Sequence, residues 1–173
     1  DYATRCAAIC LVAVMAGCGA PSAEVRSDAE KRAQVEAMCV EYHRSFPDVP
    51  EVSAEGLSRL LATGDVVLVD VRTEDERKVS GIPDAISKAA FEEDEDGYVD
   101  KTIVTYCTIG YRSGVYAEAL REKGLDARNL RGSILSWVHD GKAVVDPEGA
   151  ETKRVHVYGP EWDLLPEGYT AIW

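Results

Sequence analysis

Basic residues are scarce in this chain. Its 173 residues include 19 Lys and Arg against 31 Asp and Glu, which gives a formal net charge of -12 at pH 7. Nucleic-acid backbones need a basic surface, so this balance argues against DNA or RNA as a partner. An anionic substrate would have to be attracted by the local field of one site, because the protein as a whole does not attract it.

Metal-ligand patterns are also missing. The sequence has no Cys-x-x-Cys, and its three histidines lack the spacing of metal ligands. The acidic run at residues 92–96 is consecutive, whereas a calcium loop alternates its carboxylates and ends in a distant Glu. We therefore predict no metal site and no cofactor, and we interpret the acidic run as a solvated loop.

Long apolar runs are lacking as well. The uncharged run at residues 6–18 is too short to span a bilayer comfortably as a helix. A basic residue before it and small residues at its end are typical of a secretory signal, which we expect at residues 1–17. The sequence Met15-Ala-Gly-Cys18 is similar to the lipobox of bacterial lipoproteins, which implies cleavage before Cys18 and lipid attachment to its sulfur.

That resemblance predicts an exported protein, held on the periplasmic side of a bacterial membrane through lipid on Cys18. An ordinary signal peptide, which would give a secreted protein, and a short uncleaved anchor are the alternatives. A tether is expected at residues 18–27 and an N-terminal helix at residues 28–46.

Few cysteines remain after such cleavage. With Cys18 lipidated, only Cys39 and Cys107 keep free thiols, which excludes a disulfide framework. Cys39 lies on the apolar face of the expected N-terminal helix, where Val35 and Tyr42 recur at three- and four-residue steps. We expect Cys39 to pack in that helix interface, and a resolving role against Cys107 stays open.

What the sequence does contain is a cysteine between a strand and a helix. An apolar, β-branched run at residues 102–106 predicts a buried strand that ends at Cys107. Four residues separate Cys107 from Arg112. Ser113 follows, and we expect its hydroxyl to cap a helix that ends at Gly124.

This loop predicts an activated thiol. Gly110 allows a tight curl, in which successive N–H groups form an anion-binding nest. The helix N-terminus and the guanidinium of Arg112 add positive potential. Together they favour the thiolate, lower the pKa of Cys107 and would hold an anion bonded to its sulfur, such as a persulfide. The alternative is a buried core cysteine beside a helix arginine.

The neighbouring residues carry a family resemblance. The segment Cys107-Thr-Ile-Gly-Tyr-Arg-Ser-Gly114, with Leu130-Arg-Gly132 after it, resembles the rhodanese-like family. Upstream, Val67-Leu-Val-Asp70-Val-Arg72 and Gly81-Ile-Pro-Asp-Ala85-Ile86 are similar to the other half of the family's pattern, so the resemblance covers residues 51–146. The family often has a His between that Gly and Ile, and two glycines where this chain has Gly132-Ser133; neither position is expected to carry sulfur chemistry.

The resemblance implies an α/β fold: a parallel sheet of about five strands with helices on both faces, at residues 47–146. An N-terminal helix and a C-terminal extension at residues 147–173 would flank it. Strand–helix alternation in the sequence favours the same architecture. We expect strands at residues 49–52, 66–71, 82–86 and 127–130, and short helices from Ser53, Thr73 and Ser133.

The C-terminal extension has its own pattern. Residues 153–158 alternate like a strand, and we interpret them as the partner of residues 143–145 in a hairpin. The aromatic and apolar residues that follow are too many for a free tail, and we expect them to pack on the domain.

The resemblance also implies roles for individual residues. Cys107 would be the nucleophile, taking sulfane sulfur from a small-molecule donor and passing it to a thiol or cyanide. Asp70 and Arg72 would be structural, as a cap and as an ion pair with Glu74 or Glu76. The loop residues implied to bind the substrate are Thr108, Ile109, Gly110, Tyr111, Arg112 and Ser113.

Two other functions stay open. Related folds use a cysteine loop on phosphate or arsenate, and an intact loop does not separate an enzyme from a non-enzymatic sulfur carrier or interaction module at the membrane. In the family, a six-residue loop such as residues 107–112 accompanies sulfur transfer, and the phosphatases and arsenate reductases have one residue more. We therefore expect sulfur transfer. Arg112 is the one formal cation of this loop, so thiosulfate, a dianion, is expected to bind weakly.

Overall fold

The computed structural model describes residues 26–173. The expected signal peptide, Cys18 and most of the tether lie outside the described residues. None of the helices in the described part of the chain has the length and apolarity needed to cross a bilayer.

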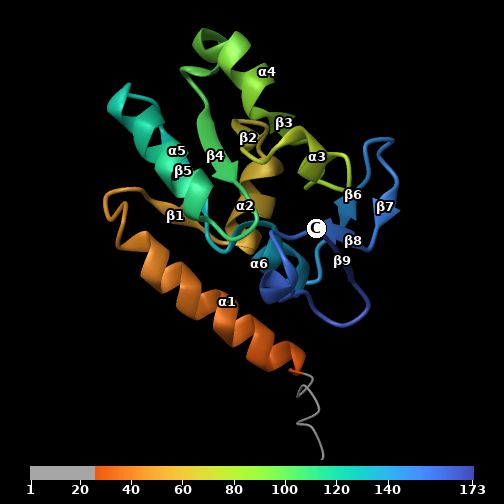
Figure 1. Cartoon of the computed structure of the whole chain (residues 1–173). Helices are drawn as coiled ribbons and strands as arrows, with labels where there is room; N and C mark the ends of the chain where they lie inside the picture. The colour runs from red at the N-terminus through yellow and green to blue at the C-terminus, as the bar shows by residue number, and fades with distance from the viewer. Residues whose placement is uncertain (1–25) are drawn as a thin grey trace, which may run out of the picture.

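A five-stranded parallel sheet forms the centre of the molecule (Figure 1). Its strand order is β1-β5-β4-β2-β3, so the predicted parallel sheet is confirmed. The edge strand expected at residues 49–52 forms, but it is limited to residues 51–52. The strands are β1 (Glu51–Val52), β2 (Val66–Asp70), β3 (Ile86–Ser87), β4 (Thr102–Tyr106) and β5 (Ala127–Leu130).

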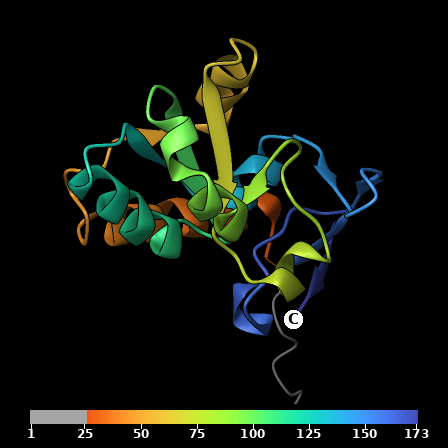
Figure 2. The same cartoon turned by 90° about the horizontal axis from the view of Figure 1, so that it is seen from above.

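Helices cover both faces of this sheet, because buried side chains alternate along the central strands. Leu68 and Val104 belong to one core, with α2 and α6, whereas Val69 and Ile103 belong to the other, with α4 and α5. Figure 2 shows helices on the two sides of the sheet. The helices are α1 (Asp28–His43), α2 (Ala54–Leu61), α3 (Glu74–Arg77), α4 (Lys88–Glu93), α5 (Tyr111–Glu122) and α6 (Ser133–His139).

The N-terminal helix begins at a capping box, in which Ser27 and Glu30 satisfy each other's backbone N–H groups. Val35 and Cys39 on its apolar face are buried against the domain, as predicted. The helix packs against α5 and α6. It therefore lies close to the loop between β4 and α5.

Two predictions for residues 82–96 were wrong. The strand expected at residues 82–86 is reduced to β3. Asp84 has a left-handed φ of 64°, and the N–H of Ile82 donates to the hydroxyl of Tyr106 and not to a neighbouring strand. The acidic run is helical, split between α4 and a 3₁₀ turn, η1 (Glu95–Tyr98). Stacking of the Phe91 and Tyr98 rings, with centroids 5.2 Å apart, holds that turn on the domain.

The C-terminal extension packs on the domain, as expected, but its strands pair differently. Residues 144–145 pair with residues 151–152, and the strand at residues 154–156 takes residues 170–172 as a parallel partner. Leu164 and Leu165 are buried, and Lys31 of α1 donates to the carbonyl of Leu165. The elements are β6 (Val144–Val145), β7 (Glu151–Thr152), β8 (Arg154–His156), η2 (Pro160–Trp162) and β9 (Thr170–Ile172).

Candidate functional site

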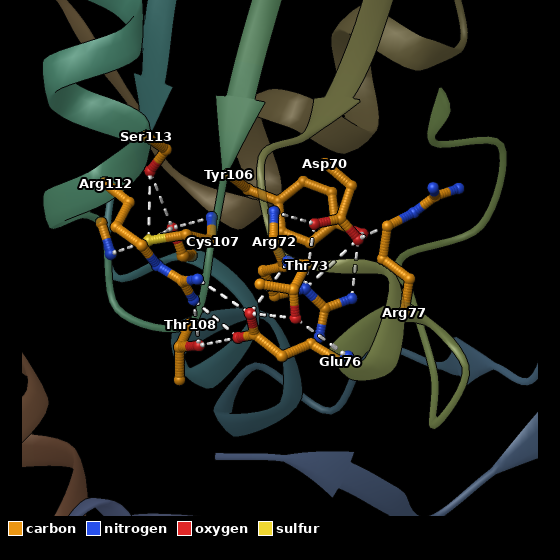
Figure 3. Close-up of polar contacts among 12 residues, drawn as sticks. Asp70, Arg72, Thr73, Glu76, Arg77, Tyr106, Cys107, Thr108, Arg112 and Ser113 are labelled. Atoms are coloured by element: carbon orange, nitrogen blue, oxygen red, sulfur yellow. Dashed lines mark hydrogen bonds and ion pairs between the residues drawn. The ribbon is translucent and has the colours of Figure 1, made fainter. Parts of the chain in front are cut away.

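Cys107 lies at the carboxyl end of β4, in the loop that leads into α5 (Figure 3). Its side chain is 1% exposed. The backbone N–H of Gly110 donates to its sulfur at 3.1 Å. Gly110 has a φ of 112°, which non-glycine residues rarely adopt, and this turn points the N–H back at the sulfur. The loop therefore holds Sγ as a hydrogen-bond acceptor.

Ser113 has a different role from the one expected. The helix begins at Tyr111, three residues earlier than a cap at Ser113 predicts, because the left-handed Gly110 serves as its N-cap without a side-chain bond. Ser113 is therefore inside the first turn and faces the site. Its hydroxyl lies 3.5 Å from the Cys107 sulfur and 2.7 Å from Oδ1 of Asn129. Since a hydroxyl has one hydrogen, Ser113 donates to one of these acceptors at a time.

The contacts of Ser133 and Asn129 with the Cys107 loop were not predicted from the sequence. The N–H of Cys107 donates to Oγ of Ser133 at 3.0 Å, and Asn129 donates its amide to the carbonyl of Gly110 at 2.9 Å. Ser133 adopts a φ of 49°, a conformation that costs a serine energy. The family often has two glycines at this point, and that departure was the signal available in the sequence. Contrary to the expectation for this position, Ser133 contacts Cys107 directly.

These contacts decide the ionisation of Cys107. Burial alone would raise its pKa, but the hydroxyl and N–H of Ser113, the charge of Arg112 and the N–H of Gly110 lower it below the ordinary value of a thiol. The stabilisation of the thiolate by these hydrogen bonds and by the charge of Arg112 exceeds the desolvation penalty. The site accordingly favours a thiolate, which is the nucleophilic form of cysteine.

Arg112 closes the loop from its far end. Its two terminal nitrogens donate to the Glu76 carboxylate at 2.8 and 2.6 Å, and one of them also donates to Oγ1 of Thr108 at 3.2 Å (Figure 3). Burial would raise the pKa of Glu76, but the bonds from Arg112 and Thr73 lower it to about 2. Glu76 is held in place by the capping box of α3, in which it pairs with Thr73.

Asp70 and Arg72 are bonded to each other, which corrects the expected pairing of Arg72 with Glu74 or Glu76. Arg72 donates from Nε at 3.0 Å and from Nη2 at 2.7 Å to the Asp70 carboxylate. Asp70 also caps the backbone N–H of Arg72 and accepts a bond from Tyr106. The bonds of this cluster join β2, β4 and the segment before β3.

Proteins that are similar to this chain share its fold and point to a reaction class. Residues 53–140 match the rhodanese-like domain family. The chain belongs to the rhodanese-like family. A sulfurtransferase of Allochromatium vinosum is 38% identical over 112 residues, which are 58% of this chain and 99% of that protein. A tRNA sulfurtransferase of Desulfurococcus amylolyticus is 33% identical over 144 residues, which are 79% of this chain but 30% of that relative.

A solved structure agrees on the fold. The thiosulfate sulfurtransferase of Pseudomonas aeruginosa superposes with a TM-score of 0.52 and 20% identity, over 79% of this chain and 26% of that one. At this level of identity the likeness concerns the fold alone. The loop with Cys107 lies inside the matched rhodanese-like residues.

A pocket opens in front of the cysteine of this rhodanese-like domain. Its volume is about 360 Å³. The C-terminal extension rims this site through Tyr158 and Trp162, and α1 supplies a further wall through Tyr42. The lining residues are Tyr42, Cys107, Thr108, Ile109, Tyr111, Arg112, Tyr158 and Trp162.

The second free thiol of the described residues, that of Cys39, is in an environment that disfavours the thiolate. Cys39 is buried in the α1 interface, and this burial raises its pKa to about 12. A resolving cysteine needs an accessible thiolate, so the environment of Cys39 favours the packing role expected from the sequence. Within residues 26–173, no group of three or more His, Cys, Asp or Glu side chains is arranged to hold a metal ion.

Proposed function

We propose that this protein is a sulfurtransferase that carries sulfane sulfur as a persulfide on Cys107. The observation that carries the proposal is the buried cysteine sulfur, which accepts the Gly110 N–H at 3.1 Å and has a lowered pKa. The names of the relatives, among them one 38% identical over nearly its whole length, support the same reaction class.

The proposed reaction has two balanced steps. The Cys107 thiolate attacks the outer sulfur of a donor, the donor's bond to that sulfur breaks, and the leaving group departs with the bonding electron pair. A thiolate or cyanide then attacks the outer sulfur of the persulfide, and the Cys107 thiolate is released. The site provides what both steps need: donors that stabilise negative charge at the sulfur without supplying a proton.

Arg112 supports sulfur transfer over oxyanion hydrolysis. A tetrahedral phosphate or arsenate needs a donor for each oxygen, and phosphate sites commonly use an arginine fork for this. Here the fork of Arg112 is already bonded to Glu76. The six-residue loop from Cys107 through Arg112 also favours the smaller group, a single outer sulfur.

The acceptor and the location belong to the proposal as well. We propose a thiol or cyanide as acceptor, and a position on the periplasmic side of a bacterial membrane through lipid on Cys18, from the sequence Met15-Ala-Gly-Cys18. The name of one relative refers to tRNA. tRNA is not part of the proposal, because a net charge of -12 disfavours binding to a phosphate backbone.

Intact mass spectrometry tests this function directly. After incubation with thiosulfate, we expect the purified protein to gain one sulfur atom, and cyanide should remove it as thiocyanate. Cys107→Ser should abolish the gain, whereas Cys39→Ser, the matched control, should keep it. A wild-type protein that never gains sulfur and instead hydrolyses an aryl phosphate would overturn the proposal.

A further inference from the structure

The pocket in front of Cys107 has a wall of aromatic rings that lie outside the matched residues 53–140. Tyr42 comes from α1, and Tyr158 and Trp162 come from the C-terminal extension. The rings are arranged edge to face in two pairs. Tyr42 meets Tyr111 with centroids 5.3 Å apart at 63°, and Tyr158 meets Trp162 at 6.2 Å and 63°. Edge-to-face pairs of this kind hold ring faces in fixed orientations.

Two of these rings are open to solvent. Tyr158 is 68% exposed and Tyr111 is 46% exposed, although both are large side chains that proteins usually cover. They stand beside the reactive sulfur, where a bound molecule would cover them. A volume of about 360 Å³ holds a ring-sized organic group together with the transferred sulfur.

The charge of this pocket is close to neutral. Arg112 is the one formal cation among its lining residues, and its guanidinium is bonded to the Glu76 carboxylate. The same guanidinium lies 5.6 Å from the centroid of the Tyr158 ring. An anion in the pocket thus meets the loop N–H groups and a cation whose charge is largely compensated, so a second negative charge on the donor gains little.

Resting on the proposed function, we infer that this pocket selects sulfur donors with a flat apolar body and a single negative charge. The rings of Tyr158 and Trp162 stack on that body, and α1 completes the wall through Tyr42. The chemical class is an organic persulfide or thiosulfonate, R–SO₂–S⁻. The thiolate of Cys107 attacks the outer sulfur, the S–S bond breaks, and the sulfinate R–SO₂⁻ leaves with the electron pair.

Three donors separate the contributions of charge and body. Thiosulfate is a dianion without an organic body, methanethiosulfonate is a small monoanion, and benzenethiosulfonate is a monoanion with a flat ring. We expect kcat/KM with cyanide as acceptor to rise in that order, by about tenfold from methyl to phenyl, since one good aromatic contact contributes on this scale. The gain should appear mainly as a lower KM for benzenethiosulfonate.

Variants of one exposed ring test where this selectivity arises. Tyr158→Ala should remove most of the phenyl preference, measured as the ratio of kcat/KM for benzenethiosulfonate to kcat/KM for methanethiosulfonate, because the ring contact is lost. Tyr158→Phe should keep the preference. Trp173→Ala is the matched control, because Trp173 is 63% exposed in the same extension and does not line the pocket. Trp162→Leu should act like Tyr158→Ala while preserving an apolar side chain at that position.

The outcomes are distinguishable. Sulfur transfer from all three donors with equal kcat/KM, or a phenyl preference that Tyr158→Ala and Trp162→Leu leave intact, overturns the inference while the proposed function stands. Absence of transfer from every donor, with no sulfur gained by Cys107 in the mass spectrum, overturns both.

Discussion

Arg112 and Glu76 are joined by a bidentate pair of hydrogen bonds of 2.8 and 2.6 Å, which connect the first turn of α5 to α3. The bond pattern makes the arginine part of the frame of the loop. Thr108 adds a third point of contact, since its hydroxyl lies within 3.3 Å of the same carboxylate. The two helices therefore fix the curvature of the loop around Cys107 from opposite sides.

Removal of the Glu76 charge should weaken this frame. We expect Glu76→Gln to lower the free energy of unfolding by about 2–3 kcal/mol near neutral pH, since it leaves a partly buried guanidinium without its counter-charge. The rate of sulfur loading on Cys107 should fall with it. Glu74→Gln is the control, because that side chain is 81% exposed. Urea denaturation and single-turnover mass spectrometry measure the two effects, and equal values for both variants would contradict this role.

The same pair predicts a pH dependence. The pKa of Glu76 is lowered from 4.5 to about 2 in the folded protein, so its contribution to stability is complete above the unfolded value and is lost as pH falls toward the folded value. The stability difference between wild type and Glu76→Gln should be constant above about pH 5 and shrink between pH 4.5 and 2. A difference that stays unchanged down to the lower limit would show that Glu76 titrates normally.

Ser113 should help to keep the pKa of Cys107 low. Because its hydroxyl and N–H help to lower the pKa of Cys107, we expect Ser113→Ala to raise that pKa and to slow alkylation by iodoacetamide at neutral pH. Ser58→Ala, which removes a hydroxyl bonded to a carbonyl within α2, serves as the control. The measurement is the alkylation rate as a function of pH, and superimposable profiles for Ser113→Ala and wild type would exclude this influence.

Gly114 should tolerate no larger residue while Phe46 is present. A Cβ at Gly114 would lie 2.1 Å from Cζ of the buried Phe46 ring. We expect Gly114→Ala to destabilise the protein by about 1–3 kcal/mol through overpacking. Phe46→Leu introduced into Gly114→Ala should recover part of this loss, whereas Phe46→Leu alone should destabilise. Thermal unfolding of the four proteins gives the coupling, and simple additivity would argue against the clash.

The anchor is a prediction from the sequence. Lipid on Cys18 should make membrane association firm, because more than one acyl chain is needed for stable anchoring. After expression in a bacterium, the wild type should sediment with membranes and Cys18→Ala should be released. Equal solubility of both proteins after export would remove the lipoprotein assignment.

The elements that the sequence predicted best are those with strong local signals. The buried strands follow from β-branched runs such as residues 102–106, and the position of Cys107 follows from the strand end and the glycine after it. Ser53 and Thr73 cap their helices as expected, because capping depends on a few neighbouring residues.

Features that depend on distant partners were not predictable in this way. Ser113 was expected to be a cap, but its contacts with Asn129 and Cys107 exist only once β5 lies beside β4. The pairing of Arg112 with Glu76 joins residues that no sequence pattern connects. Tyr158 likewise reaches the pocket only through the fold of the extension, whose strand pairing differs from the expected hairpin.

The pairing of β1 with β5 has a consequence for the order of folding. In this pairing, Glu51 is opposite Asn129 and Val52 is opposite Leu130. The edge strand β1 therefore joins the sheet only after β5, the last strand of the sheet in the chain, is in place. Closure of so long a loop is slow compared with the local steps that form helices. We expect α1, which precedes β1 and packs against α5 and α6, to dock late, and the ring of Tyr42 to reach Cys107 only in the last stage of assembly.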